Sequence, residues 1–320
     1  MGADLPVVDV APLVRGEDDE AVAAELDRAC RELGFFYVVG HGVDPALEAR
    51  LEDSARALFA LPDPAKERIA MRHGGRAWRG WFPLHGELTS GRPDEKEGVY
   101  FGAELPAGDP RPMHGPNLFP AELPALRDAV LAWLDAMTAL GQAILRGLAL
   151  GLGLPAPWFS DHLTGDPLVL LRLFRYPPEA PGWGVAEHTD YGLLTILKQD
   201  ASGGLEVRSG ASWLEAPPIP GSFVCNLGDM LERLTAGRYR STPHRVRNPT
   251  TTDRLSCPFF LDPSWDAEVV PLPLDVTGPA GPPPERWDGT DVVAGVTGTY
   301  GEYLMQKVGK VFPDLGTDVL

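Results

Sequence analysis

The sequence predicts an α+β protein with a mainly β core, in which a helical flank precedes short strands that form a sandwich or barrel. Apolar residues recur at helical spacing through the first half of the chain, whereas the second half has short apolar runs bounded by glycine or proline. Hydrophobic residues make up 44% of the 320 positions, which is enough for a sizeable packed core. We find no internal repeat, so we expect one cooperative unit.

The first 160 residues are expected to be mostly helical. Val22, Leu26 and Cys30 are spaced as on one face of a helix over residues 17–33, and Phe35–Val39 follows as a short buried strand. Asp44 is expected to cap a second helix, because a proline follows it at the first helical position. A long helix is predicted over residues 121–151, and residues 72–93, rich in Gly, Arg and Trp, are expected to form a loop.

Beyond Pro155 the pattern changes from helical to strand-like. Short strands are predicted over residues 168–176, 193–197, 205–207 and 222–225. A proline-rich surface excursion over residues 271–284 is expected to precede a last helix over residues 300–311.

The charge and cysteine content exclude several classes of protein. The chain has 45 Asp and Glu against 28 Lys and Arg, a net charge of −17, and such a surface repels the phosphates of nucleic acids. The three cysteines, Cys30, Cys225 and Cys257, are too few and too scattered for a disulfide framework or a zinc site, and the last two are expected to be inert core thiols. No signal peptide or run of about 18 apolar residues is evident. We expect a cytoplasmic protein, a monomer or weak homo-oligomer that binds neither nucleic acid nor membrane.

His188, Thr189 and Asp190 form a candidate metal motif. On a strand, positions two apart face the same side, so the imidazole and the carboxylate would both point into the core. They supply two of the three ligands of a 2-His-1-carboxylate triad, which suits non-haem Fe(II), although the motif taken alone is more often a surface turn. His244, in a distant strand-like stretch, is the expected third ligand.

Arg254 and Ser256 lie two apart on an otherwise apolar strand. A buried arginine needs an anionic partner, and its fork-shaped guanidinium suits a carboxylate, to which the serine can add one hydrogen bond. The alternative is an internal salt bridge with a glutamate.

A series of motifs runs through nearly the whole chain. They are Leu-Pro-Val-Val-Asp near the start, Gly34-Phe-Phe-Tyr-Val-Val-Gly-His-Gly42, Tyr176-Pro177, His188-Thr-Asp190, Asn226-Leu-Gly-Asp229, His244-Arg-Val, Arg254-Leu-Ser256 and Tyr300-Gly-Glu-Tyr-Leu. In this order they resemble the isopenicillin N synthase-like Fe(II)/2-oxoglutarate-dependent dioxygenases.

The resemblance implies a fold and a set of ligands. The fold is a double-stranded β-helix, the cupin-like jelly roll, flanked by helices. His188, Asp190 and His244 would be the catalytic iron ligands, Arg254 and Ser256 would bind the distal carboxylate of 2-oxoglutarate, and Tyr176 would contact the same cosubstrate. Phe174 stands where plant relatives carry an asparagine, so that polar contact is not expected.

The resemblance also implies an organisation of the chain. Residues 1–320 would form a single dioxygenase domain. It would comprise a mostly helical N-terminal flank (1–160), a β-helix core with the iron site (165–265), a Pro-rich excursion (266–298) and a C-terminal helix (299–312).

The activity implied is an Fe(II)- and 2-oxoglutarate-dependent oxygenase in specialised metabolism. It would use O2 to hydroxylate, desaturate or cyclise a small-molecule substrate with release of succinate and CO2. Three alternatives stay open: a 2-oxoglutarate-independent oxidase of the isopenicillin N synthase type, an ethylene-forming enzyme, and a non-catalytic jelly-roll binding protein.

Further residues are expected around the substrate. Arg79, Trp81, Phe82, Tyr100 and Phe260 are predicted to wall the pocket, which suggests a small, partly apolar molecule carrying an acid group. Arg172 and Tyr176 are four residues apart on the same predicted strand, so their side chains should face the same side. Arg172 either forms an ion pair inside the protein or faces the pocket.

Other polar residues are expected to be structural. His41 is predicted to order a turn, and Asn226 and Asp229 a turn and a helix start. The remaining histidines, expected at the surface or behind the ligands, are His73, His85, His114 and His162.

Overall fold

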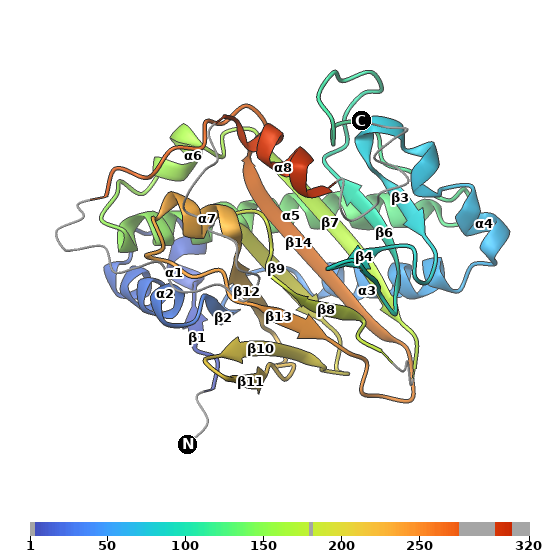
Figure 1. Ribbon diagram of the computed structural model, residues 1–320, viewed down its shortest axis with the longest axis horizontal. Coiled ribbons are helices and arrows are strands. Elements are labelled where there is room, and N and C mark those ends of the chain that lie inside the picture. Colours follow the sequence, from blue (N-terminus) through green and yellow to red (C-terminus); the bar gives the residue numbers. More distant parts are fainter. Residues whose placement is uncertain (1–3, 179–181, 275–297, 309–320) are drawn as a thin grey trace.

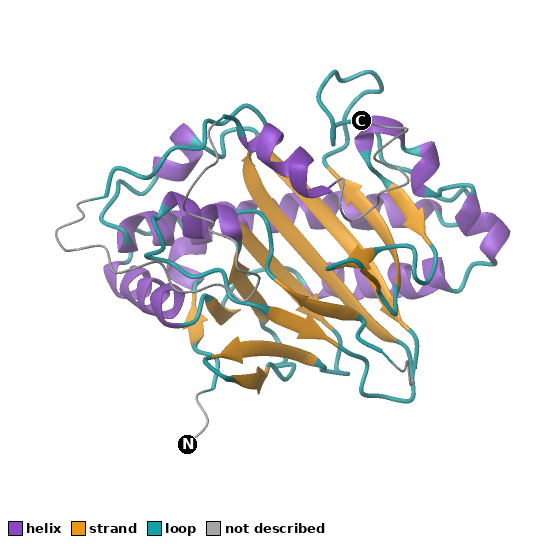
Figure 2. Cartoon of the chain, viewed as in Figure 1, coloured by secondary structure: helices purple, strands orange, loops and turns teal. Residues whose placement is uncertain are grey.

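The computed structural model describes residues 4–178, 182–274 and 298–308. Within these residues the chain forms a large sheet, a smaller sheet and a layer of helices (Figures 1 and 2). This arrangement confirms the predicted α+β class with a β core.

The large sheet is built from both halves of the chain. Its described strands run in the order β1-β2-β12-β9-β14-β7-β6-β3. Their bounds are β1 (Val7–Asp9), β2 (Phe35–Val39), β3 (Gly80–Phe82), β6 (Glu97–Gly102), β7 (Pro167–Tyr176), β9 (Leu194–Gln199), β12 (Phe223–Leu227) and β14 (Arg254–Ser264). The mostly helical flank therefore also contributes four strands to this sheet. Of these four, only β2 is a run of apolar residues that is long enough to be predicted as a strand from the sequence.

The smaller sheet has the order β11-β10-β13-β8. Its strands are β8 (Val185–His188), β10 (Leu205–Ser209), β11 (Ser212–Glu215) and β13 (His244–Val246). Residues 72–93, expected to be a loop, are more ordered than predicted. They contain two short 3-10 helices, Met71–His73 and Gly75–Ala77, strand β3, and the hairpin of β4 (Leu88–Thr89) and β5 (Arg92–Pro93).

The described helices are α1 (Ala11–Val14), α2 (Glu20–Glu32), α3 (Pro45–Phe59), α4 (Asp63–Glu67), α5 (Pro124–Gly151), α6 (Trp158–His162), α7 (Asp229–Leu234) and α8 (Tyr300–Val308). Helix α5 crosses behind the strands of the large sheet and forms a layer with α1, α2, α3 and α6, whereas α8 contacts β14 from the front (Figure 1). Asp44 caps α3 as predicted, because its side chain accepts a hydrogen bond from the Ala46 amide.

Helix α5 is the centre of this layer. Among the described helices it alone is long and apolar enough to cross a membrane, which the sequence analysis did not expect, but half of its most apolar window is buried inside the structure. It contacts α1, α2 and α3 on one side and β7, β9 and β14 on the other, and these contacts account for its apolar composition. Gly141 permits the close approach to the sheet, because a β-carbon there would lie 2.7 Å from Leu261 Cδ1.

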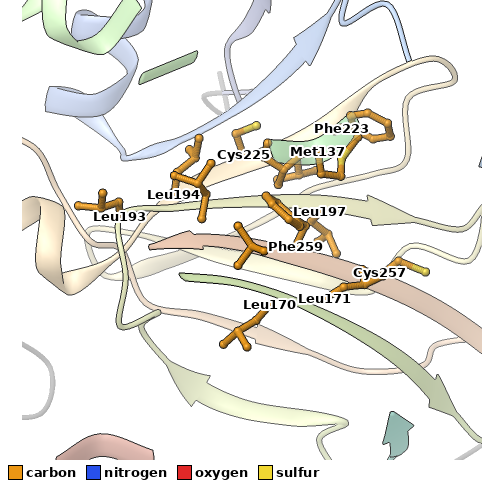
Figure 3. Packing of buried hydrophobic residues seen from close by; sticks show 14 of the residues in the cluster. Met137, Leu170, Leu171, Leu193, Leu194, Leu197, Phe223, Cys225, Cys257 and Phe259 are labelled. Carbon is orange, nitrogen blue, oxygen red and sulfur yellow. The ribbon is translucent and has the colours of Figure 1, made fainter. Parts of the chain in front are cut away.

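The hydrophobic core lies between α5 and the large sheet (Figure 3). Met137 of α5 and Phe259 of β14 have no exposed surface. Cys225 and Cys257 are free and buried in this core, as predicted.

The C-terminal part is described only in part. Most of the Pro-rich excursion expected over residues 266–298 lies outside the described residues, as does the end of the helix expected over residues 299–312. Helix α8 lies within that expected range.

Candidate active site

A cavity of about 440 Å³ lies between the two sheets. Strands β7, β9 and β14 line it from the large sheet, and β8 and β13 line it from the smaller one. Residues around the β4–β5 hairpin and from α8 complete the wall. A volume of this size suits small molecules.

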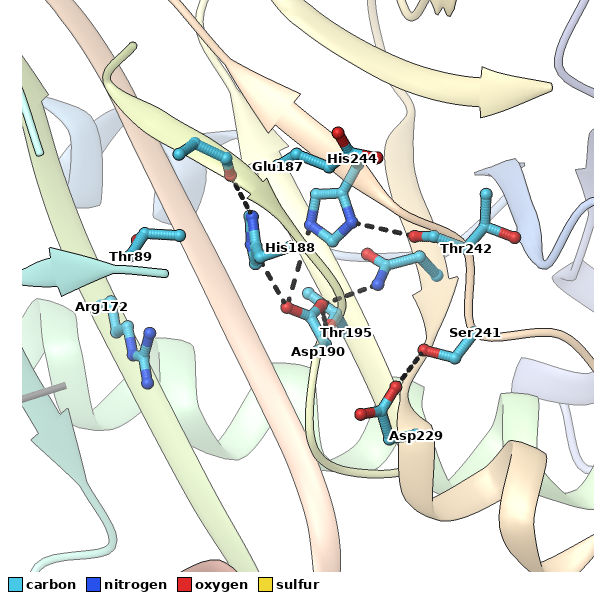
Figure 4. Close-up of polar contacts among 12 residues, drawn as sticks. Thr89, Arg172, Glu187, His188, Asp190, Thr195, Asp229, Ser241, Thr242 and His244 are labelled. Atoms are coloured by element: carbon cyan, nitrogen blue, oxygen red, sulfur yellow. Dashed lines mark hydrogen bonds and ion pairs between the residues drawn. The ribbon is translucent and has the colours of Figure 1, made fainter. Parts of the chain in front are cut away.

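His188, Asp190 and His244 converge on this cavity (Figure 4). His188 ends β8 and His244 begins β13, and the two residues are direct cross-strand partners. The Nε2 atom of each imidazole lies 3.8 Å from Asp190 Oδ1, and one ligand atom from each of the three residues lies within 4.8 Å of the others. The expectation that Asp190 lies on the strand is wrong, because β8 ends at His188. The Asp229 amide donates to the Asp190 carbonyl oxygen at 2.7 Å in the connection that follows.

Hydrogen bonds orient these three side chains. The Nδ1–H of His188 donates to the Ala186 carbonyl at 2.8 Å, and that of His244 donates to the Thr242 carbonyl at 3.2 Å, so each Nε2 lone pair is left for a ligand. Asp190 Oδ2 accepts hydrogen bonds from Asn226 Nδ2, at 2.7 Å, and from the Thr195 hydroxyl. The other oxygen, Oδ1, faces the imidazoles.

Asn226 therefore has a role that the sequence analysis missed. It was expected to order a turn, but it lies within β12 and holds the Asp190 carboxylate. Asp229 does begin α7, as predicted, and it also lines the cavity and accepts a hydrogen bond from the Ser241 hydroxyl.

The electrostatics suit a divalent metal. Burial, reinforced by the neighbouring His244, lowers the pKa of His188, so its imidazole is neutral. Burial raises the pKa of Asp190, but the two imidazoles and the hydrogen bonds from Thr195 and Asn226 outweigh it and hold the pKa below its usual value. Two imidazoles and one carboxylate are the donor set preferred by non-haem Fe(II).

Arg254 provides a second, independent feature. It is opposite Tyr176 in the β14–β7 pair, and its guanidinium carbon lies 4.8 Å from the tyrosine ring centroid. The residue has no exposed surface, and its Nε donates to the Gly203 carbonyl. Its Nη1 and Nη2 atoms are buried without a hydrogen-bond partner.

The alternative of an internal salt bridge is therefore not supported. Within the described part of the chain Arg254 forms no ion pair, so it is a buried cation that lacks an anion. Tyr176 and Ser256, beside it on β7 and β14, line the cavity. A carboxylate group from a ligand fits this arrangement.

Arg172, Tyr100 and Phe260 also line the cavity, as predicted for the substrate region. The Arg172 guanidinium lies 4.4 Å from the Tyr100 ring centroid and 4.7 Å from that of Phe260. Arg172 lines the pocket, and its Nη1 also lies 3.7 Å from Glu87 Oε1, so the structure agrees in part with both expectations for this residue.

Arg79, Trp81 and Phe82 do not line this cavity, contrary to the prediction. Arg79 is buried behind it, and its Nη2 donates to the Met113 carbonyl at 3.0 Å. Trp81 Nε1 donates to Glu97, and Phe82 packs edge-on against Tyr100, with ring centroids 5.5 Å apart. Trp81 and Phe82 lie on β3 at the edge of the sheet, and Phe82 contacts the cavity wall through Tyr100 and Phe174.

A buried ionic cluster beside the cavity is not predicted by the sequence motifs. Lys96 Nζ lies 2.9 Å from Glu87 Oε2 and also pairs with Asp94, while the Tyr100 hydroxyl donates to Glu87 Oε1. Glu87 and Lys96 line the cavity. Lys96 and Tyr100 are four residues apart, so on a strand their side chains face the same side. This spacing was the one feature of the sequence that could have placed Lys96 near the cavity.

The other histidines are not part of the site. His41 Nδ1 accepts from the Val43 amide and its ring stacks on Phe223 at 4.2 Å, consistent with a structural turn. His114 is buried rather than at the surface. Neither these two nor His73, His85 or His162 line the cavity.

Comparison with known protein families identifies the chain. The N-terminal model of non-haem dioxygenases in morphine synthesis matches residues 5–122, and the 2OG-Fe(II) oxygenase superfamily model matches residues 167–263. The second match contains His188, Asp190, His244, Arg254 and Ser256.

Full-length relatives agree with the family models. A probable iron/ascorbate oxidoreductase of Dictyostelium discoideum is 40% identical, over 99% of this chain and 97% of the relative. A homoarginine-6-hydroxylase of Oryza sativa subsp. japonica is 37% identical, over 96% of this chain and 98% of the relative.

A solved structure extends the likeness to the fold. A Neurospora crassa protein, crystallised in complex with alpha-KG (2-oxoglutarate) and thymine, superimposes with a TM-score of 0.77 at 26% identity, covering 95% of this chain and 96% of that chain. The predicted double-stranded β-helix flanked by helices is thereby confirmed. The chain belongs to the 2OG-Fe(II) oxygenase superfamily and is a non-haem dioxygenase that uses Fe(II), 2-oxoglutarate and O2.

Proposed function

We propose that His188, Asp190 and His244 hold Fe(II), and that Arg254, Ser256 and Tyr176 bind 2-oxoglutarate. The observation that carries this proposal is the pair of unpartnered Nη atoms on Arg254, in a buried residue whose neighbours line the same cavity as the His-Asp-His cluster. A buried guanidinium without an anion is unfavourable, and the distal carboxylate of the cosubstrate supplies the missing charge and acceptors.

The residues around the metal have separate tasks. The backbone carbonyls of Ala186 and Thr242 fix the tautomers of the two imidazoles, so that both Nε2 atoms point to one position. Asn226 and Thr195 hold one oxygen of Asp190 and leave the other for the metal. With Fe(II), 2-oxoglutarate and O2 bound, the centre supplies the oxidant for a substrate C–H bond, with release of succinate and CO2.

The cavity wall determines which bond is oxidised. Apolar and aromatic side chains, among them Phe174, Leu170 and Phe260, exclude water from the space beside the cluster and fix the substrate's position. Hydroxylation is the proposed outcome, supported by the homoarginine-6-hydroxylase relative, whose name records that reaction. An amino acid such as homoarginine is accordingly one candidate substrate.

The proposal predicts how the enzyme consumes labelled 2-oxoglutarate. With Fe(II) and a panel of small acids and amino acids, the wild type should form succinate, whereas His188→Ala and Asp190→Ala should form none. His73→Ala is the matched control, because His73 is exposed and outside the cavity.

Two results would contradict this assignment. Succinate formation at the wild-type rate in either ligand variant would exclude those residues as iron ligands. Substrate oxidation without succinate would favour a 2-oxoglutarate-independent oxidase, and ethylene in the headspace would favour an ethylene-forming enzyme.

The setting of the enzyme is a further part of the proposal. The net charge of −17 supports an enzyme that binds neither nucleic acid nor anionic membranes. We expect it to work in the cytoplasm as a monomer or weak homo-oligomer, which size-exclusion chromatography with light scattering would test.

A further inference from the structure

Arg172 is a half-buried cation that lies between two aromatic rings inside the cavity. It lies on β7 between Tyr100 of β6 and Phe260 of β14, at 4.4 Å and 4.7 Å from the two ring centroids. Its side chain keeps 22% of its surface exposed, and it lines the cavity. Contact with two rings restricts the orientation of the guanidinium.

The hydrogen-bonding capacity of this guanidinium is unused. Its Nε is buried without a partner, and none of the residues in 4–178, 182–274 and 298–308 accepts a hydrogen bond from Arg172. The nearest paired oxygen, Glu87 Oε1, lies 3.7 Å from Nη1, which is beyond hydrogen-bond range. Leaving such donors unpaired in a buried site is costly unless a ligand accepts from them.

The cosubstrate does not fill this position under the proposed assignment. Arg172 precedes Tyr176 by four residues on the same face of β7, which places the two about 13 Å apart along the strand. A 2-oxoglutarate held by Arg254 and Tyr176 therefore leaves Arg172 for a second molecule.

The remaining charges of the cavity limit what this molecule carries. Lys96 is paired with Glu87 and Asp94, and Lys307 lies 3.8 Å from Asp229. Glu87 also lies within ion-pair distance of Arg172, so the charges of Glu87, Asp94, Lys96 and Arg172 balance one another. Among the described cations that line the cavity, Arg172 is the one with a buried nitrogen that lacks a hydrogen-bond partner, which suits a ligand with a single acid group. A guanidinium can hold a carboxylate through two parallel hydrogen bonds.

We propose that the substrate is a small monocarboxylic acid whose carboxylate binds Arg172, with Tyr100 and Phe260 enclosing the adjoining part of the molecule. This inference rests on the proposed function, because it takes the other end of the cavity as the 2-oxoglutarate site. Arg172 then sets the distance between the carboxylate and the oxidised carbon, so it determines both substrate choice and the position of oxidation.

The test uses matched pairs of molecules. Succinate formation is measured with a library of monocarboxylic acids, including amino acids with apolar, aromatic and charged side chains and simple aryl and alkyl acids, each beside its carboxamide. Acids should stimulate turnover and their carboxamides should not. For the best acid, Arg172→Gln should lower kcat/KM about 10–100-fold, and Arg172→Lys should lower it less.

Controls separate this inference from the proposed function. The charge-transfer absorption of the anaerobic Fe(II)–2-oxoglutarate complex should be unchanged in Arg172→Gln, which also shows that the variant is folded. Arg56→Gln, an exposed arginine on α3, should match the wild type throughout. Equal stimulation by acids and carboxamides, no response to any acid, or an unchanged kcat/KM in Arg172→Gln would overturn the inference while the absorption band persists. Absence of the band in the wild type would instead contradict the proposed function.

Discussion

At the scale of single residues, two arginines define the chemistry of the cavity. Arg254 is buried and Arg172 is half-buried, and both have buried guanidinium nitrogens without hydrogen-bond partners. Folding removes these N–H donors from water without giving them acceptors, which is unfavourable. A ligand carboxylate supplies the acceptors, so the ligand-free enzyme favours the binding of anions.

This view predicts an unusual effect of Arg254→Met. Removing the uncompensated cation should raise the free energy of unfolding of the ligand-free protein, by about 1–3 kcal/mol. The same change should abolish the rise in melting temperature that 2-oxoglutarate gives the wild type. Thermal unfolding with and without the cosubstrate measures both effects.

The control for this prediction is Arg56→Met, at an exposed ion pair, which should change the free energy of unfolding by less than about 0.5 kcal/mol. If Arg254→Met lowered the melting temperature and kept the response to 2-oxoglutarate, the account of Arg254 would be wrong.

Individual site residues could be predicted from the sequence where they belong to a recognisable motif. His188, Asp190 and His244 are brought together as expected. Thr195 and Asn226, which hold Asp190, could not be identified, because their role depends on β9 and β12 lying side by side next to the cluster.

At the scale of elements, α8 is fixed to the sheet by a buried pair. The Tyr300 hydroxyl donates to Asp262 Oδ2 at 2.6 Å, and Leu193 N donates to Oδ1 at 3.3 Å. Leu304, Lys307 and Val308 of α8 then form part of the cavity wall. The attachment of this helix is therefore coupled to the shape of the substrate space.

Asp262 gives stability a pH dependence of defined sign. Burial raises the pKa of Asp262 to about 7, from an unperturbed value near 4. Between these values the unfolded chain has lost the proton and the folded protein keeps it, so the contribution of Asp262 to stability falls as pH rises and is constant above pH 7. The total change is at most about 4 kcal/mol.

The variant Asp262→Asn isolates this effect. It cannot ionise, so its melting temperature relative to the wild type should increase steadily from pH 4 to 7 and then level off. A difference between the two proteins that does not change with pH would contradict the assignment.

Helix ends offer a second prediction at this scale. Gly34 follows α2 with a φ of +69°, and a β-carbon there would lie 2.0 Å from the Arg240 carbonyl oxygen. Gly153 follows α5 with a φ of +78° and has no atom within 4 Å of a built β-carbon. Gly34→Ala should therefore cost more than Gly153→Ala, which carries only the backbone strain of about 1 kcal/mol.

Chemical denaturation measures this difference directly. We expect Gly34→Ala to be at least about 2 kcal/mol less stable than Gly153→Ala, because the backbone of Arg240 must move. Equal costs would show that the segment carrying Arg240 is not firmly placed against α2.

At the scale of the whole molecule, the fold brings distant parts of the chain to one cavity. His188 meets His244 across β8 and β13, and Tyr176 meets Arg254 across β7 and β14. Most helices and strands could be predicted from the sequence. The signals were the helical spacing of apolar residues in α2, α3 and α5 and the short apolar runs in the second half of the chain. The β3–β6 region could not be predicted, because its strands are short and its buried charges resemble a solvated loop until Glu87, Asp94 and Lys96 are paired in space.

We propose that one cavity holds both Fe(II) and 2-oxoglutarate through His188, Asp190, His244, Arg254, Ser256 and Tyr176. Anaerobic titration of the Fe(II)-loaded protein with 2-oxoglutarate, followed by visible absorption, is the decisive experiment. We expect a saturable metal-to-ligand charge-transfer band in the wild type and in His73→Ala, no band in His188→Ala, and saturation of Arg254→Met only at much higher 2-oxoglutarate. A wild type without the band, or a His188→Ala variant that keeps it, would contradict the account.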